Sequence, residues 1–163
     1  MATTRPDHLY RSDYYAWARD QADALRRLAA ERWNGPLDLA NLAEEVDDLG
    51  KSERNAVLSQ SERLIEHLLK LQLSRSVEPR RGWIVTVDDA RRELEKHLTE
   101  ALRQELEAAL PELYRRERKR TARKLALFDD REAADALPEA CPYTVRELCD
   151  EDWLPPESAC GKP

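Results

Sequence analysis

Glycine, cysteine, phenylalanine and β-branched residues are all scarce in this chain. Its 163 residues include four glycines, one phenylalanine and three cysteines. The cysteines Cys141, Cys149 and Cys160 form no Cys-x-x-Cys pair, so they give no zinc or redox motif and are typical of unpaired thiols in a reducing cytoplasm. No apolar run approaches the roughly 20 residues of a membrane span, and residues 1–8 lack the apolar core of a signal peptide.

Positive charge is also in deficit. The 33 acidic residues outnumber the 27 basic ones, and the net charge is −6. This balance disfavours general binding to nucleic acid or to an anionic membrane, because both require a positive field. The abundant residues are leucine, alanine, glutamate and arginine, which all favour helices. Length and composition therefore predict an all-α, soluble, cytoplasmic protein.

Hydrophobic periodicity predicts an antiparallel bundle of four main helices with a short helical C-terminal segment. Asp38 is expected to cap the second helix, Gly50 to kink or break it, and Pro111 to begin the fourth. The expected helices cover residues 12–33, 38–74, 83–110, 111–128 and 144–149. The expected inner stripe of the first helix is Tyr14, Trp17, Ala18, Gln21, Leu25 and Leu28.

No internal repeat or linker divides the sequence. We therefore expect a single domain over residues 1–156, followed by a flexible tail over residues 157–163.

Several short motifs follow one another along the chain in a specific order and spacing. They are Leu9-Tyr10, Asp13-Tyr14, Trp17, the block Asp38–Ser52, His67–Lys70, Trp83, Thr86-Val87, Arg91, Cys141–Thr144 and Asp152–Pro155. In this combination the chain resembles the bacterial domain-of-unknown-function family twenty-nine over nearly its full length. The resemblance implies an all-helical bacterial protein, and the activity of that family is not established.

Arg91 lies in the apolar stripe of the third predicted helix. A buried arginine must find anionic or carbonyl partners, and Glu45 or Glu53 of the second helix is the natural candidate. We expect a polar constellation made of Glu45, Glu53, His67, Lys70, Thr86 and Arg91. It forms either a structural hydrogen-bonded network that fixes the helix register or a site for a small ligand or for catalysis.

The acidic block on the second helix offers a different function. Four carboxylates occupy the five positions Glu44–Asp48, and the pair Glu45-x-x-Asp48 is similar to the Mg²⁺ ligands of all-α nucleotide pyrophosphohydrolases. Glu44, Glu45 and Asp48 are the candidate ligands in that reading. We favour no metal or cofactor, for two reasons. A magnesium site would need a second acidic pair, and in Asp20-x-x-Asp23 the side chain of Asp23 is turned away from the apolar stripe. A di-iron site would need the motif Glu-x-x-His, which is absent from the sequence.

A basic run, Arg115–Lys124, holds seven lysines and arginines in ten residues. We interpret it as a solvated helix face rather than a nucleic-acid site. The leading interpretation is a cytoplasmic protein that acts through a protein or small-molecule partner, with homo-oligomerisation left open and no membrane or nucleic-acid role. The alternative is a magnesium-dependent hydrolase.

Overall fold

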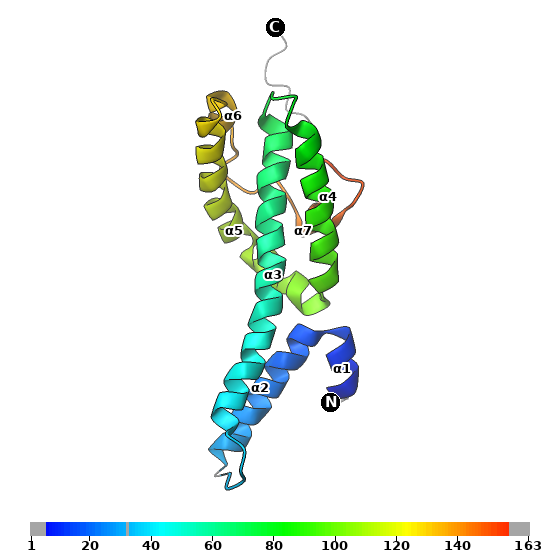
Figure 1. The fold of residues 1–163 in the computed structure, drawn as a ribbon, viewed down its shortest axis with the longest axis vertical. Coiled ribbons are helices and arrows are strands. Elements are labelled where there is room, and N and C mark those ends of the chain that lie inside the picture. The colour runs from blue at the N-terminus through cyan, green and yellow to red at the C-terminus, as the bar shows by residue number, and fades with distance from the viewer. Residues whose placement is uncertain (1–5, 32, 157–163) are drawn as a thin grey trace. The chain divides into compact units, whose positions relative to one another are not determined.

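The computed structural model describes residues 6–31 and 33–156 of the chain (Figure 1). This part of the chain forms helices and no strand, which confirms the predicted all-α fold class. The helices are α1 (Pro6–Ser12), α2 (Tyr14–Ala30), α3 (Leu39–Leu73), α4 (Arg80–His97), α5 (Glu100–Leu127), α6 (Arg131–Asp135) and α7 (Val145–Cys149). None of the described helices combines the length and apolar character needed to cross a membrane.

The chain divides into two compact units. Unit 1 consists of Met1–Val57 and His97–Gln104, and unit 2 consists of Leu58–Lys96 and Glu105–Pro163. The single domain expected over residues 1–156 stays a prediction, and the tail expected over 157–163 lies outside the described residues. Each unit has buried apolar residues of its own. Those of unit 1 include Tyr15, Ala18, Ala22, Leu39, Ala43, Val57 and Leu102.

The larger apolar core belongs to unit 2, where three long helices and the C-terminal segment contribute to it. Its fully buried residues include Leu64, Ile65, Leu68 and Leu69 of α3, Val87, Ala90 and Leu94 of α4, Leu106, Leu113 and Tyr114 of α5, and Leu148 of α7. Two polar side chains also make contacts beside this core, one by a hydrogen bond and one by a cation–π interaction. The Tyr114 hydroxyl donates to the carbonyl oxygen of Pro138 at 2.6 Å, and the Lys70 ammonium lies 5.9 Å from the centre of the Trp83 ring.

The break of α3 offered for Gly50 is wrong, because the helix runs unbroken from Leu39 to Leu73, while the alternative, a kink, stays a prediction. Gly50 is buried, and a Cβ atom built there would lie 3.3 Å from the Cβ of Ala18. The glycine therefore allows α2 to approach the backbone of α3 closely within unit 1. The predicted start of α3 is confirmed, since Asp38 Oδ1 accepts the Asn41 N–H at 3.2 Å.

The predicted boundary between the third and fourth helices was wrong. The break lies at Leu98 and Thr99, and Pro111 sits inside α5. The first N–H groups of a helix need acceptors, and here Thr99 Oγ1 accepts from Leu102 at 3.3 Å, while Asp13 Oδ2 accepts from Ala101 at 3.0 Å. A carboxylate distant in sequence therefore helps to begin α5.

The C-terminal third follows local capping rules. At the end of α5, Asp129 takes a left-handed φ of 60°, and the Asp130 N–H donates to the Leu125 carbonyl oxygen at 2.9 Å. The helix α6, which follows, was not predicted. The expected helix over residues 144–149 is confirmed as α7, with a capping box formed by Thr144 and Glu147.

The carboxylate of Asp13 accepts hydrogen bonds from first-turn N–H groups of two helices in unit 1. Asp13 Oδ1 accepts the Ala16 N–H of α2 at 3.0 Å, while its other oxygen accepts the Ala101 N–H of α5. We predict that Asp13→Ala lowers the free energy of unfolding by about 2 kcal/mol, since each lost cap costs about 1 kcal/mol. Asp13→Asn, which keeps one acceptor, should lose about half of that. Urea unfolding and amide exchange at Ala16 and Ala101 measure the effect, and an unchanged alanine variant would contradict it.

Candidate functional site

Arg91 is buried, as its place in the apolar stripe predicts, but main-chain carbonyl groups bind it instead of a carboxylate. The guanidinium donates to four carbonyl oxygens, those of Glu147, Leu148, Glu151 and Trp153, at 3.2, 3.1, 3.3 and 2.7 Å. The expected pairing with Glu45 or Glu53 was therefore wrong. Residues at and after the end of α7 leave carbonyl groups without helical partners, and the planar guanidinium carries enough donors for four of them.

Burial lowers the pKa of Arg91, because its acceptors are neutral and compensate the lost hydration only in part. Nearby carboxylates, Asp88 and Asp150, act in the opposite direction. The guanidinium still carries its charge at neutral pH. Arg91 therefore holds the C-terminal segment of unit 2, and four of its five N–H donors are occupied within the protein.

The other five residues of the predicted constellation have separate surroundings. Glu45 is exposed, and Glu53 contacts His97 Nδ1 at 2.8 Å. The other three residues have partners on their own helices. His67 contacts the Arg63 carbonyl oxygen at 2.9 Å, Lys70 donates to Glu66 at 2.5 Å, and Thr86 donates to the Gly82 carbonyl oxygen at 2.9 Å. The last three contacts each join residues four apart on one helix. Within unit 2, His67, Lys70 and Thr86 therefore do not join Arg91 in one network.

The acidic block lies on the first half of α3, in unit 1. Glu44 and Glu45 are exposed, and Asp48 accepts from the Lys51 ammonium at 2.8 Å. Across residues 6–31 and 33–156, no three His, Cys, Asp or Glu side chains are grouped so that they could hold a metal ion. The absence of a cofactor stays a prediction, as does the magnesium alternative at Glu44, Glu45 and Asp48.

Unit 2 contains a solvent-open recess of about 380 Å³ between α3 and α5. One stripe of each helix lines it, since the residues on each helix lie three or four positions apart. The lining residues are Ser59, Glu62, Arg63 and Glu66 of α3, and Glu117, Arg120 and Lys124 of α5. Sequence reasoning missed this site, because it treated the basic run as a solvated face. Glu117, the one acid inside that run, is the signal that could have indicated it.

Two buried carboxylates in the recess behave differently. Burial acts to raise the pKa of Glu66, but hydrogen bonds from Lys124 and Lys70 outweigh it, so the pKa is lowered. The two ammonium groups lie 2.6 and 2.5 Å from its oxygens. Burial and the neighbouring Glu66 raise the pKa of Glu117, whose partner is Arg120 at 3.3 Å. Glu66 is therefore a fixed anion, while Glu117 gains a proton more readily than an ordinary glutamate.

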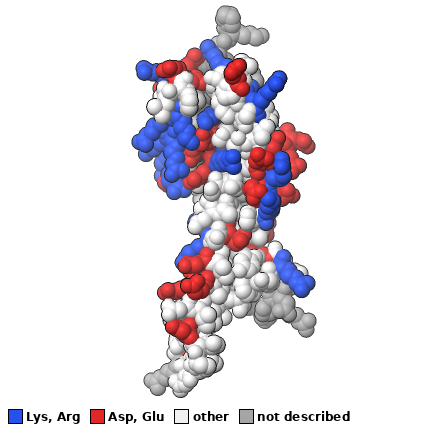
Figure 2. All heavy atoms as spheres, in the orientation of Figure 1, with Lys and Arg blue, Asp and Glu red and all other residues white. Residues whose placement is uncertain are grey.

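Arginines of α5 bind the third carboxylate of the recess, Glu62 of α3. Arg116 Nη2 lies 3.1 Å from one of its oxygens, and Arg120 Nη1 lies 3.3 Å from the other. Figure 2 shows blue atoms gathered over α5, which carries the whole basic run. The lining residue Arg63 and its neighbour one turn earlier, Ser59, have side chains without a hydrogen-bond partner among the described residues.

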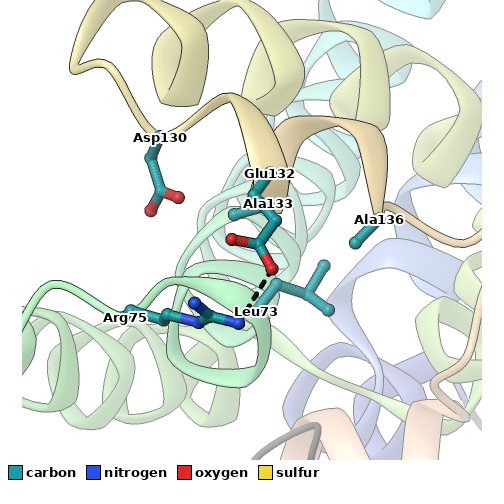
Figure 3. Close-up of a pocket in the computed structure, with 6 residues that line it drawn as sticks. All are labelled: Leu73, Arg75, Asp130, Glu132, Ala133 and Ala136. Carbon is teal, nitrogen blue, oxygen red and sulfur yellow. Dashed lines mark hydrogen bonds and ion pairs between the residues drawn. The ribbon is translucent and has the colours of Figure 1, made fainter. Parts of the chain in front are cut away.

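A second pocket in unit 2 is too small for a ligand. It has a volume of about 10 Å³, room for about one water molecule. Arg75 and Glu132 point toward each other across it with an N–O distance of 2.8 Å (Figure 3). Beside them, the Ser74 hydroxyl donates to Asp130, which joins the end of α3 to the start of α6. This pocket is a structural contact.

We predict that Arg91→Ala and Arg91→Leu both release residues 145–153, because both leave four carbonyl oxygens without donors. Leucine should be the milder change, since it fills the space, and alanine should cost about 3 kcal/mol or more. Arg91→Lys should restore only part of the lost stability, because an ammonium group lacks the planar arrangement of N–H donors that a guanidinium has. Amide exchange in residues 145–153 and the melting temperature measure this. Unchanged exchange in the alanine variant would refute it.

Comparison with known proteins gives a family and a fold but no activity. The chain is similar to an alpha-helical protein of unknown function from Rhodospirillum rubrum, known from a crystal structure at 1.45 Å resolution. The two are 25% identical with a TM-score of 0.77, over 88% of this chain and 90% of the other. None of the curated proteins compared with the chain matches it. The profile of the domain of unknown function DUF29 matches residues 9–154, and the chain therefore belongs to the DUF29 family.

Proposed function

We propose that this protein is a bacterial cytoplasmic binding protein, and that the recess between α3 and α5 holds a small dianion. The observation that carries this proposal is the convergence of cationic side chains from both helices on one solvent-open recess. A volume of about 380 Å³ is within the range of small-molecule sites, about 300 to 1,000 Å³. A dicarboxylate or a phosphate monoester has the matching size and charge.

The charge of the recess favours an anion. Five cations lie in or against it, namely Arg63, Lys70, Arg116, Arg120 and Lys124. Three of these cations, Arg63, Arg120 and Lys124, line the recess together with the carboxylates Glu62, Glu66 and Glu117, so the lining alone is neutral. Lys70 and Arg116 lie outside the lining and bind Glu66 and Glu62, and counting them gives the site a charge of +2. Protonation of Glu117 raises this by one. The carboxylates hold the cations in place, which reduces the ordering cost of binding a ligand.

Two donors in the recess are available to a ligand. Arg63 and Ser59 lie one turn apart on α3, and neither has a hydrogen-bond partner in the described part of the chain. Arg120 uses one nitrogen, Nη1, for its carboxylate partners and has further N–H groups. A carboxylate or phosphate between Arg63 and Arg120 would accept charge-assisted hydrogen bonds from both helices.

Nucleic acid is a poorer ligand for this face than a small dianion. Several cations of the basic run already bind acceptors inside the protein, as Arg116, Arg118 and Lys124 do. A duplex would need many phosphate contacts at once, while the net charge of the chain is −6. A small anion needs only the recess.

We expect isothermal calorimetry to show saturable binding of at least one small dianion from a panel of sulfate, succinate and phosphoserine. Arg63→Gln should weaken this binding about tenfold, the equivalent of one charge-assisted hydrogen bond. Arg92→Gln on α4 is the matched control, because Arg92 is exposed and pairs with Asp89. Binding by none of the three probes, or equal weakening by the control, would contradict the proposal. Duplex DNA in the same titration should not compete.

Sulfate binding should tighten as the pH falls. Burial and the neighbouring Glu66 raise the pKa of Glu117, so Glu117 is protonated first and a negative charge leaves the recess. Affinity is therefore lowest above that raised pKa and increases as the pH falls through it. Sulfate does not titrate between about pH 8 and about pH 5. In that range His67 is a second side chain of unit 2 that can change its charge. Glu117→Gln should bind more tightly at high pH and flatten the profile, and an unchanged profile would exclude this role.

A further inference from the structure

Three apolar side chains of unit 2 are almost fully exposed. Val77, Leu127 and Phe128 are 80, 81 and 82% accessible to solvent, so the described part of the chain covers little of them. Other exposed apolar side chains are covered more fully. Val85 of α4 is 57% accessible, and Leu28 of α2, which was wrongly predicted to lie in the core, is 37% accessible. Bulky apolar side chains that gather in one place on a surface indicate a binding surface.

The three side chains come from two connections at the same end of unit 2 (Figure 1). Val77 lies in the loop between α3 and α4, and the other two lie where α5 ends. The Ser74 hydroxyl, at the start of that loop, donates to Asp130, which follows Phe128 by two residues. This hydrogen bond joins the two connections. We call Val77, Leu127 and Phe128 the apolar tip.

The charge of the chain is unevenly distributed, and its positive part lies towards the apolar tip. Residues 115–132 hold eight basic and four acidic residues, a net charge of +4. The whole chain has a net charge of −6, so the other 145 residues carry −10. We expected no membrane role from the net charge, which conceals this difference. An anionic surface meets the local charge, because the Debye length is only about 8 Å at physiological salt.

Three cations of this segment are available to an anionic surface. Lys119, Arg123 and Arg131 are exposed and have no partner among the described residues. Asp129, the exposed acid in the turn after α5, offsets one of these charges. Lys119, Arg123 and Leu127 follow one another at intervals of four residues, so they lie along one side of α5.

We infer that the apolar tip inserts into the surface of a bilayer that contains anionic lipids. Peripheral proteins bury apolar side chains about 5 to 10 Å deep, at the boundary between headgroups and acyl chains. Arg123 and Lys119 lie about 6 and 12 Å behind Leu127 along the helix. With the tip inserted, these two cations reach the level of the lipid phosphates, where long basic side chains bind.

A bilayer fits this surface better than a protein does. A stable protein interface buries about 800 Å² on each partner, whereas three side chains offer roughly 400 Å². Their exposure above or at 80% also means that the surface is convex there and has no groove for a partner side chain. A bilayer needs no matching pocket, and it combines apolar insertion with electrostatic attraction, the two contributions that hold a peripheral protein.

Co-sedimentation of the full-length protein with lipid vesicles tests this inference. We expect saturable binding to phosphatidylcholine vesicles that contain about 30% phosphatidylglycerol, and at least tenfold weaker binding to phosphatidylcholine alone. Leu127→Gln with Phe128→Gln should weaken the binding at least tenfold, because less apolar area leaves water. Leu49→Gln in unit 1 is the matched control, since Leu49 is an exposed helical leucine outside unit 2, 47% accessible.

A second pair of changes tests the electrostatic contribution. Lys119→Gln with Arg123→Gln should weaken binding to the anionic vesicles about 25-fold at low salt, since each cation near the surface contributes about fivefold. Arg92→Gln on α4 is the control, because Arg92 is exposed and pairs with Asp89. Binding of the wild type should weaken between about 0.05 and about 0.15 M salt.

No binding to the anionic vesicles would overturn the inference, and so would binding that survives the change of Leu127 and Phe128. A dimer in light scattering that this same change converts to a monomer would assign the apolar tip to a second copy instead. Far-UV circular dichroism checks that each variant keeps its helices. None of the four substituted residues of unit 2 lines the recess, so loss of vesicle binding with unchanged sulfate binding separates this inference from the proposed function.

Discussion

The main-chain carbonyl groups of residues 137–153 must find donors, and unit 2 depends on how they do so. This segment contains one five-residue helix, α7, so most of its carbonyl groups have no partner of the helical kind. Arg91 of α4 supplies donors to four of them, and Arg118 of α5 supplies donors to two more. Tyr143 completes the attachment by donating to Gln72 of α3 at 2.9 Å. Side chains of all three long helices therefore bind one irregular segment.

This use of arginine determines where charge remains for a ligand. Arg91 and Arg118 bind neutral dipoles, so they need no carboxylates, and Glu62 and Glu66 of α3 are left to organise the cations of α5. Those carboxylates neutralise part of the positive charge and hold the side chains in fixed positions. A preorganised, slightly positive recess binds a small anion better than a flexible basic surface would. The site we propose thus follows from the same distribution of donors and acceptors that fixes the fold.

The sequence predicted what depends on local signals. Helix type follows from composition and periodicity, and the caps at Asp38 and Thr144 depend on residues within one turn. The break before α5 was misplaced to Pro111, because one of its acceptors is Asp13, far away in sequence. The partners of Arg91 were misassigned for a related reason. A sequence shows which side chains carry charge, but it does not show which main-chain carbonyl groups lack a donor until the chain is folded.

The claim that Arg91 is enclosed by carbonyl groups is tested most directly by solvent exchange of its guanidinium protons in NMR spectra. Arg92, the next residue of α4, is the internal control, because its side chain is 67% exposed and pairs with Asp89 at 3.5 Å. Our account predicts that the Nε and Nη protons of Arg91 exchange slowly and are resolved at neutral pH, while those of Arg92 are lost to exchange. Equal, fast exchange at both residues would contradict the account.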